Sequence, residues 1–472
     1  MSGTEGALYQ SPFASRYGSD DMRAVWSEVA RRRTWRRIWL AVAEGQASAG
    51  LVSPAQVDDL RAHLDTIDMP RAAALEVEIG HDVMAELRTY AEQCPVGGPI
   101  LHWGLTSADV QDNADVARQR AALGLLLGRL RDVLLAFAEQ IDATNDMPVL
   151  GYTHLQPAEP TTLGYRLAVY AQDLLGHFES LARLRLALRG KGIRGAVGTA
   201  APLVEMLQGT GVTPEALEDG VLRSLGIEAH AIVTQTYPRV QDYQLITTLA
   251  ALAASLSKFA FDLRLMQSPG LGPLAAEPFG ERQVGSTAMP FKRNPVKAEQ
   301  VCSLARLVSS FASVAWHNAA DALLERTLDD SANRRSLIPE SFLATEQMLI
   351  STETIVAGLE VDEARAAELL EAHGPFAATE RILSALVRAG ADRQVIHERL
   401  RLHARTAWEA VHAGKPNPLV SQLTTDTVLL RYAQPARLRE LLDVRGYVGQ
   451  APERARALAR TLRQRLGAAG PE

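Results

Sequence analysis

A short run rich in glycine and proline, residues 285–295, brings together a serine hydroxyl, two cations and an amide. A serine accepts a proton only if its alkoxide is stabilised, and Lys292, Arg293 and loop N–H groups supply positive potential beside Ser286. Ser286 is therefore a candidate proton acceptor. Because Gly-Ser-Thr is also common in ordinary loops, the run alone does not establish this chemistry.

Two histidines are candidates for the complementary proton transfer. His154 lies in a segment that a proline closes at Pro157, with a hydroxyl and an amide as sequence neighbours. Histidine is the natural proton donor near neutral pH. His81 precedes Asp82, whose carboxylate is able to fix the tautomer of an imidazole. For both histidines a structural role, in a loop or at a helix cap, is the alternative.

Anion binding is the third kind of chemistry that the residue types indicate. Thr106 and Ser107 precede a long predicted helix, where hydroxyls cap the helix and the helix N-terminus attracts anions. Residues 326–335 concentrate guanidinium and hydroxyl groups that suit phosphate or carboxylate. A solvated network of ion pairs is the alternative reading of residues 326–335.

Long helices are the elements that must position these residues. Apolar spacing predicts a helix from about Asp109 to Asp142, and Ser53-Pro54 has the form of a helix start. A second seam, with steps of four and three residues, predicts a long packed helix through Leu245, Leu249, Leu252, Leu256, Phe259 and Leu263. Period-two alternation is scarce, so we expect an all-α fold with little sheet.

Three segments resist a helical assignment: residues 145–160, 193–202 and 268–295. A loop as long as 268–295 inside a compact protein is usually functional, often as an active-site lid, although a disordered excursion suits residues 270–275. Helices after about residue 361 should be shorter, with breaks at Gly374-Pro375 and at residues 416–418. These changes predict three domains: 1–108, 109–360 with the lid loop 268–295, and 361–472.

Composition narrows the class of protein. The 472 residues are 47% hydrophobic and 22% charged, which is typical of a folded globular chain, and the net charge of −6 favours neither nucleic acid nor membrane as a partner. Residues 31–37 are rich in arginine, but flanking apolar residues at helical spacing predict one polar helix face. Two distant cysteines indicate neither a disulfide framework nor a metal site.

Two further observations predict a cytoplasmic protein. No apolar stretch reaches the length of a transmembrane helix by our reading of the sequence. Residues 1–18 are polar and lack the apolar core of a secretory signal.

Taken together, these segments resemble the adenylosuccinate lyase family of the fumarase/aspartase superfamily. Residues 285–295 are similar to the signature motif of the superfamily, and their sequence Ala-Met-Pro-aromatic-Lys-Arg-Asn-Pro resembles the form of that motif in this family. Ordered agreement along nearly the whole chain makes the resemblance specific. Its other segments are residues 15–17, 81–84, 106–107, 151–162, 235–237 and 325–335.

The resemblance implies a fold and an assembly. Chains of this superfamily have three all-α domains, and their central long helices assemble with three further subunits into a tetrameric twenty-helix core. Active sites lie where three subunits meet. The resemblance implies a small-molecule substrate, no metal and no organic cofactor. Separate loops carry the candidates near residues 81, 107, 154 and 286, which agrees with sites that are shared between subunits.

Residue roles also follow from the resemblance. Ser286 would remove the proton from the succinyl carbon, and His154 would protonate the departing nitrogen, with His81 and Asp82 orienting it or the substrate. The carbanion would be stabilised as an aci-carboxylate by Lys292, Asn294, Thr106 and Ser107. Gln235 would hold a substrate carboxylate. The contacts to the nucleotide phosphate and ribose would come from Arg16, Tyr17, Arg326, Ser331 and Arg335.

The expected reaction is elimination of fumarate from adenylosuccinate, and also from the succinylated aminoimidazole carboxamide ribotide (SAICAR), in purine synthesis. Three cations familiar in the family are replaced by Gly80, Tyr165 and Gln300. The alternative is therefore a specialised paralogue that acts on another succinyl-amine adduct, for example in nucleoside-antibiotic metabolism. A silent structural paralogue predicts decay of Ser286 and His154, which are intact, and a carboxymuconate cycloisomerase would not need the nucleotide contacts.

Overall fold

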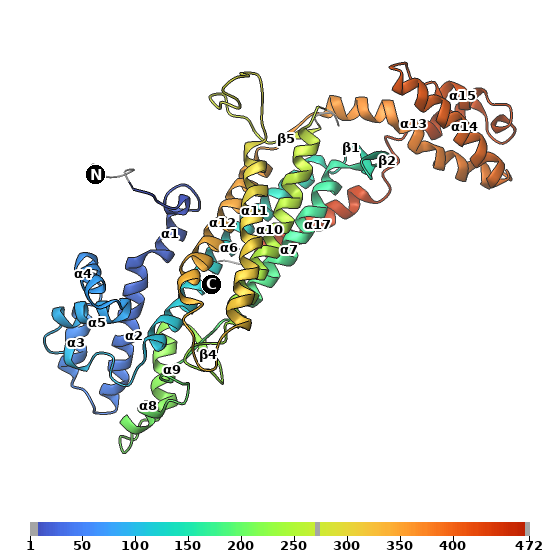
Figure 1. Cartoon of the computed structure of the whole chain (residues 1–472). Helices are drawn as coiled ribbons and strands as arrows, with labels where there is room; N and C mark the ends of the chain where they lie inside the picture. Colours follow the sequence, from blue (N-terminus) through green and yellow to red (C-terminus); the bar gives the residue numbers. More distant parts are fainter. Residues whose placement is uncertain (1–7, 270–273, 468–472) are drawn as a thin grey trace. The chain divides into compact units, whose positions relative to one another are not determined.

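The computed structural model describes residues 8–269 and 274–467, and the chain divides into two compact units. The first unit comprises Met1–Leu130, Gly176–Leu256 and Val301–Ile350, and the second comprises Arg131–Leu175, Ser257–Gln300 and Ser351–Glu472. Five long helices are drawn in Figure 1: α6 (Ser107–Thr144), α7 (Leu163–Ala187), α10 (Val240–Gln267), α11 (Val296–Ala320) and α12 (Ser331–Ala357). The boundary between the two units falls within each of them.

In the described part of the chain, the first unit adds seven further helices, and its apolar core includes residues of several of them. They are α1 (Asp20–Trp26), α2 (Glu28–Ser48), α3 (Pro54–Ala62), α4 (Met69–Ile79), α5 (Asp82–Gln93), α8 (Ala201–Met206) and α9 (Pro214–Leu225). Strands β3 (Arg189–Gly190) and β4 (Glu228–Ala229) form a parallel pair. Trp35 and Trp39 of α2 lie at the centre of this core, with Leu60 and Tyr90 of α3 and α5.

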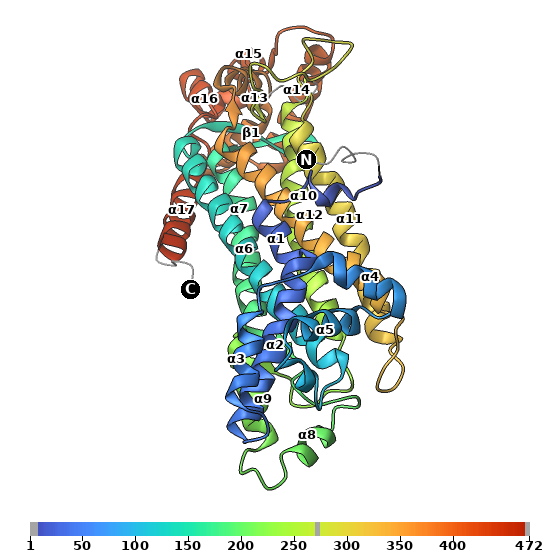
Figure 2. The same cartoon turned by 90° about the vertical axis from the view of Figure 1, so that its left-hand side faces the viewer.

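The second unit contains a β-hairpin and the C-terminal helices. The hairpin pairs β1 (Pro148–Thr153) with β2 (Gln156–Thr162), and β5 (Ala275–Ala276) pairs with β6 (Glu360–Val361), both antiparallel. The helices are α13 (Glu363–Arg388), α14 (Arg393–His412), α15 (Leu419–Thr425), α16 (Pro435–Leu442) and α17 (Ala451–Gly467). Figure 2 shows α13–α16 grouped together. Leu386, Leu400 and Leu423 belong to the apolar core of this group.

Most of the predicted elements are confirmed. The helix expected from Asp109 to Asp142 is α6, and the seam from Leu245 to Leu263 in α10 is fully buried. Ser53 caps α3 with a complete capping box that includes Gln56. In the described residues the sheets are the three two-stranded pairs, so the fold is all-α with little sheet.

The segments predicted to be non-helical fall where α-helices end. Residues 145–160 contain most of the hairpin, and 268–295 separate α10 from α11. Of residues 193–202, 193–200 are irregular, whereas Ala201 and Pro202 begin α8. Residues 270–273 of this last loop, and residues 1–7 of the polar N-terminus, lie outside the described residues. The three-domain division at residues 108/109 and 360/361 stays a prediction.

Three expectations were wrong. Arg32 and Arg36 are buried, and both form ion pairs with Glu86. These ion pairs offset the cost of burying the two charges. Residues 31–37 are therefore not simply a polar helix face. Helix α13 continues through Pro375, and Gly374 there allows close packing against Val444, whose Cγ2 would lie 2.5 Å from an added Cβ. The break expected at residues 416–418 is confirmed.

The third wrong expectation concerns apolar length. Helix α10 is long and apolar enough to cross a membrane by length and composition alone. Its seam leucines are buried within the protein, which is the behaviour of a core helix, so this test is weak evidence for a membrane span.

Candidate active site

Ser286 lies in a tight turn that directs backbone N–H groups at its hydroxyl. The N–H groups of Ala288 and Met289 donate to Ser286 Oγ at 3.3 and 3.1 Å. Such donors stabilise negative charge on the oxygen that they face. An ordinary serine turn has the same local geometry. The arrangement therefore allows Ser286 to act as a base but does not by itself require it.

The turn is closed by Asn294, whose side-chain amide donates to the carbonyl of Gly285 at 2.7 Å. Gly285 has no room for a side chain, because an added Cβ would lie 2.1 Å from the carbonyl oxygen of Lys292. Lys292 itself is exposed. Asn294 thus holds the loop in shape, a role that the sequence interpretation did not assign to it.

Two residues outside the signature segment anchor its C-terminal end. Both carboxylate oxygens of the buried Glu277 accept N–H groups of the first turn of α11, from Lys297 at 3.1 Å and from Ala298 at 2.9 Å. Gln267 donates to the carbonyl of Arg293 at 3.1 Å. Sequence reasoning missed both residues, because nothing in their local pattern separates a loop anchor from a surface polar residue.

A cavity of about 1090 Å³ borders this loop within the second unit. Lys292 and Asn294 contribute to its wall, together with Arg264 of α10 and Glu363 at the start of α13. Cations and carboxylates therefore both face this cavity.

His154 occupies a strained two-residue turn at the tip of the hairpin. Thr153 pairs with Gln156, and the two residues between them have φ values of +53° for His154 and +59° for Leu155. This left-handed turn usually uses Asn and Gly, and each larger residue in it costs about 1–2 kcal/mol. Strain of this kind is common at functional sites. The turn leaves the His154 side chain exposed.

His81 is the N-cap of α5, and its Nδ1 accepts the N–H of Met84 at 3.2 Å. The Asp82 carboxylate lies 3.9 Å from Nδ1, too far for a hydrogen bond, so the cap bond and not Asp82 orients this imidazole in the chain. Asp82 instead accepts from Arg335 at 2.8 Å, with Arg31 at 4.0 Å.

Charge explains the state of this carboxylate. Burial alone would raise the pKa of Asp82, but Arg31 and Arg335 outweigh burial and hold it below its ordinary value. Gln111 of α6 also approaches Asp82, at 3.4 Å. The first unit therefore unites the candidates Asp82 and Arg335, which are far apart in sequence, beside His81.

Thr106 and Ser107 stand at the N-terminus of α6, where Asp109 organises the surrounding loops. Its buried carboxylate accepts the N–H of Thr106 at 2.8 Å and that of Gly195 at 3.2 Å, and it pairs with the buried Lys191. Gln235 donates to the next residue of that loop, Ala196, at 3.1 Å. One loop thus links Gln235 to the N-terminus that carries Thr106 and Ser107.

A buried network holds residues 326–335 in the first unit. Arg239 binds Asp112 through two bonds of 3.0 and 3.1 Å and Asp330 through one of 2.6 Å, and Arg326 also reaches Asp330 at 2.8 Å. Burial alone would raise the pKa of Asp330, yet Arg239 and Arg326 hold it below its ordinary value. Arg326 is therefore part of an ion-paired network, which is buried around Arg239 and Asp330 and not solvated. Ser331, half-buried, begins α12.

The candidates nearest the N-terminus are held against α12. Gly18 and Ser19 donate N–H groups to Gln347 at 3.1 Å and to Glu346 at 2.7 Å. Just before them, the exposed Arg16 guanidinium lies 5.9 Å from the ring centre of Tyr17. These two side chains are thereby placed at the surface of the first unit.

The three positions that lack the family cation have ordinary structural roles. Gly80 ends α4 with φ of +65°, a conformation that suits glycine. Tyr165 lines a cavity beneath the hairpin, and Gln300 accepts the hydroxyl of Ser351 at 2.8 Å.

One group of side chains in the described residues has the spacing of metal ligands: Asp59, His63 and Cys94. Burial and Asp59 raise the pKa of the Cys94 thiol to about 12, so the thiolate form that binds metals is disfavoured. Asp59 is already occupied, because it accepts the N–H groups of Val96 and Gly97 at 2.8 Å. We assign no metal to this group.

The structure leaves the predicted site in two parts. The first unit holds His81 and the expected substrate-binding residues other than Asn294, and the second holds Ser286, Lys292, Asn294 and His154. Neither Ser286 nor His154 lines the cavity beside the loop or the cavity beneath the hairpin.

Comparisons with known proteins give one consistent result. The family described as "Lyase" matches residues 17–309, and that described as "Adenylosuccinate lyase C-terminus" matches residues 375–458. The adenylosuccinate lyase of Saccharomyces cerevisiae is 36% identical over 94% of this chain and 92% of its own length. That of Schistosoma mansoni is 36% identical over 96% and 94%.

Solved structures agree on the fold. A fumarate lyase from Mesorhizobium sp. BNC1 is similar with a TM-score of 0.81 and 26% identity, over 98% of this chain and 100% of that chain. A 3-carboxy-cis,cis-muconate lactonizing enzyme from Pseudomonas putida has a TM-score of 0.83 and 25% identity, over 97% and 99%. The all-α fold is therefore of the fumarase type.

Proposed function

We propose that this chain, which belongs to the adenylosuccinate lyase family, releases fumarate from adenylosuccinate and from SAICAR in purine nucleotide synthesis. The observation that carries the proposal is the turn at Ser286, where two N–H groups face the hydroxyl inside the signature segment of the family. The relatives from yeast and Schistosoma mansoni bear the name adenylosuccinate lyase and match nearly end to end.

The reaction begins with removal of a proton from the succinyl CH₂ carbon, which is bonded to the carbon that bears nitrogen. Ser286, as alkoxide, takes this proton, and the electron pair left on carbon spreads into the adjacent carboxylate as an aci-carboxylate. That charge would be stabilised by Lys292 and Asn294, and by the hydroxyls of Thr106 and Ser107 at the N-terminus of α6. The Ser286 turn supplies N–H donors that make the alkoxide accessible.

The second half of the reaction breaks the C–N bond. The electron pair of the carbanion forms the double bond of fumarate, the bonding pair leaves with nitrogen, and His154 gives nitrogen a proton. The exposed ring of His154 on a strained turn is free to meet a substrate from outside its own unit. His81, held by its cap bond, and Asp82, held by Arg335, would orient the substrate or the acid.

Recognition of the nucleotide is proposed for the first unit. Arg16 and Tyr17, together with Arg326, Ser331 and Arg335, would bind the phosphate and ribose, and Gln235 would hold a succinyl carboxylate. The ion pairs at Arg326 and Arg335 support the idea that these side chains are already placed before a substrate arrives. No metal or organic cofactor is needed for these steps.

Assembly into a homotetramer with shared active sites completes the proposal. Exposed apolar side chains on the long helices and the loop support it, among them Phe261, Phe291 and Trp316. We place the enzyme in the cytoplasm, with purine synthesis.

A specialised paralogue is the second candidate. Gly80, Tyr165 and Gln300 favour it, because they remove three cations that the family usually places near the substrate. The same elimination would then act on a different succinyl-amine adduct.

An ultraviolet assay of fumarate formation by the purified protein tests the proposal. The substrates are adenylosuccinate, SAICAR and several simpler N-substituted aspartates. Turnover of the two nucleotides supports it. Turnover of another aminosuccinate alone would favour the paralogue, and no turnover of any substrate would contradict a lyase function.

A further inference from the structure

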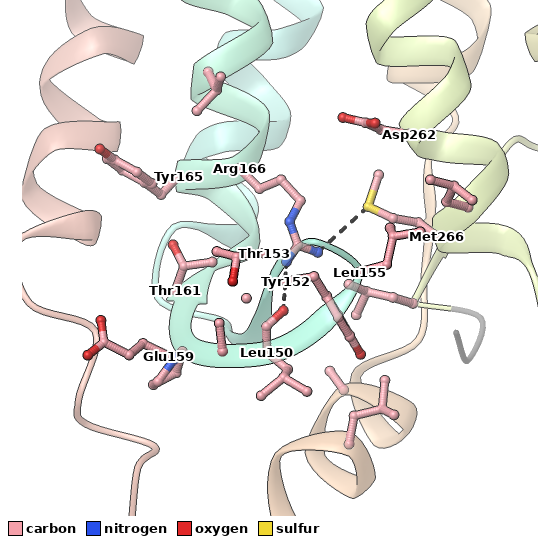
Figure 3. Close-up of a pocket in the computed structure, with 18 of the residues that line it drawn as sticks. Leu150, Tyr152, Thr153, Leu155, Glu159, Thr161, Tyr165, Arg166, Asp262 and Met266 are labelled. Atoms are coloured by element: carbon pink, nitrogen blue, oxygen red, sulfur yellow. Dashed lines mark hydrogen bonds between the residues drawn. The ribbon is translucent and has the colours of Figure 1, made fainter. Parts of the chain in front are cut away.

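A second cavity, of about 720 Å³, lies beneath the hairpin and apart from the signature loop. The hairpin forms one side of it and α7 and α10 form others, with the first turns of α13 beyond (Figure 3). Thr153 and Leu155, the neighbours of His154, line it, whereas His154 does not. Its lining is mainly apolar and aromatic, with contributions from Tyr152, Tyr165, Val169 and Met266.

Arg166 is the charge in this cavity that lacks a counter-ion. Its guanidinium donates to the carbonyl of Leu150 at 2.7 Å and to the sulfur of Met266 at 3.7 Å, as Figure 3 shows. In residues 8–269 and 274–467 no carboxylate lies within ion-pair distance of it. Burial lowers the pKa of Arg166, which indicates that its surroundings solvate the charge poorly.

The two acids in the wall are already engaged with other groups. Asp262 accepts the hydroxyl of Tyr170 at 2.6 Å and forms an ion pair with Lys258. Glu159 shares a hydrogen bond with Glu380 of α13, which raises the pKa of Glu159. The positive charge of Arg166 is therefore available to a ligand. The carboxylate of Asp262 still acts on Arg166 electrostatically, in the direction that raises its pKa.

We propose that this cavity binds a monocarboxylate with an aromatic or branched apolar body, whose carboxylate pairs with the Arg166 guanidinium. A guanidinium matches the planar geometry of a carboxylate through two parallel hydrogen bonds. Tyr152, Val169 and Met266 would contact the apolar body. A dicarboxylate fits less well, because its second charge would meet Glu159 or Asp262. The proposal is independent of the reaction assigned above.

Fluorine NMR with 4-fluorophenylacetate tests the proposal on the full-length protein. We expect saturable binding with a Kd of about 1–5 mM, from the usual binding efficiency of a ligand of this size. The uncharged analogue 4-fluorophenylacetamide should bind about tenfold more weakly, because it cannot pair with the guanidinium. Arg166→Gln should weaken binding of the acid about tenfold and leave the amide unchanged.

Two further variants separate ligand binding from folding. Val169→Trp fills the cavity from the exposed face of α7 and keeps the Arg166 guanidinium, and it should abolish binding of the acid. Arg264→Gln removes a cation of α10 that lies outside this cavity, and it should leave binding unchanged. The proposal is overturned if the wild-type protein does not bind the acid, or if acid and amide bind equally. It is also overturned if Arg166→Gln leaves the Kd of the acid unchanged, or if binding survives Val169→Trp.

Discussion

At the scale of single residues, the proposed chemistry depends on the environment of two side chains. The Ser286 hydroxyl faces two N–H donors, and His154 is held exposed on a strained turn. A serine that only shaped its turn would keep the first arrangement without catalysing anything. Substitution separates these readings, because the turn and the chemistry respond differently to loss of the hydroxyl.

We expect Ser286→Ala and His154→Ala each to lower kcat by about 10²–10⁴-fold, which is the usual contribution of one proton-transfer group. Both side chains are on loops outside the apolar cores, so the fold should survive. Stopped-flow or steady-state assays of fumarate release measure the effect, with circular dichroism as the check on folding. Near-normal turnover of either variant would contradict the proton-transfer role proposed for the residue that it replaces.

The sequence predicted where candidate residues lie in their helices better than it predicted which residues they contact. Thr106 and Ser107 were expected just before a long helix, and α6 begins at Ser107, because helical periodicity is a local property that apolar spacing reveals. The bond between Arg335 and Asp82 joins residues 253 positions apart, and only the folded chain shows it. For the same reason the sequence suggested that Asp82 orients His81, whereas a cap bond from Met84 does so.

At the scale of elements, the hairpin that carries His154 is joined to α13 by two carboxyl groups. The hydrogen bond to Glu380 raises the pKa of Glu159. The stabilisation it gives is fully present below the ordinary pKa of glutamate, about 4.3, and is lost as pH rises through the raised value. At neutral pH the pair should therefore repel and loosen the contact.

Glu159→Gln removes that repulsion and supplies a donor to Glu380 at every pH. At pH 7.5 the free energy of unfolding of the variant should exceed that of the wild type by about 0.5 kcal/mol, a small gain because solvent screens an exposed pair. The variant should therefore unfold at a higher temperature. The difference should shrink or vanish at pH 4.5. Glu371→Gln on the same helix is the matched control in the thermal scans. An equal effect at both pH values would contradict this account of the contact.

The buried arginines of the first unit connect α6 to the segment proposed to hold the nucleotide. Arg239→Gln breaks the bonds to Asp112 and Asp330, so residues 326–335 should lose their alignment. We expect kcat/KM to fall about 10–10²-fold, mostly through KM, since small displacements are costly in a binding site. Arg239→Lys should recover part of the loss.

Steady-state kinetics against substrate concentration provide the measurement for Arg239. The control is Arg399→Gln, which removes an ion pair with Asp426 in the second unit. That variant should lower stability without raising KM. An unchanged KM in Arg239→Gln would show that the network contributes to stability alone.

Elements were predictable where periodicity is long and uninterrupted, as in α6 and α10. The prediction failed where a local signal was overridden by packing. Gly374-Pro375 usually ends a helix, yet α13 continues through both residues, and Gly374 packs tightly against Val444. The hairpin at residues 148–162 has few β-branched alternations, so only its non-helical character was predicted.

At the scale of the whole molecule, the division of the candidate residues is the central fact. The loop with Ser286 and the hairpin with His154 belong to the second unit, and the expected nucleotide contacts belong to the first. Family resemblance implied active sites built from several subunits, which a single sequence cannot demonstrate. An assembly that brings loops of different chains together would reconcile separate candidates with one reaction.

Mixing two inactive variants tests this claim most directly. Ser286→Ala and His154→Ala chains, each inactive alone, are unfolded together or exchanged at equal concentration, and fumarate release is then followed by ultraviolet absorbance. If a site takes its serine and its histidine from different subunits, about one quarter of the sites would have both intact by random assortment. We predict recovery of activity near that fraction. No recovery, with mixed tetramers demonstrated by mass spectrometry, would contradict the shared site.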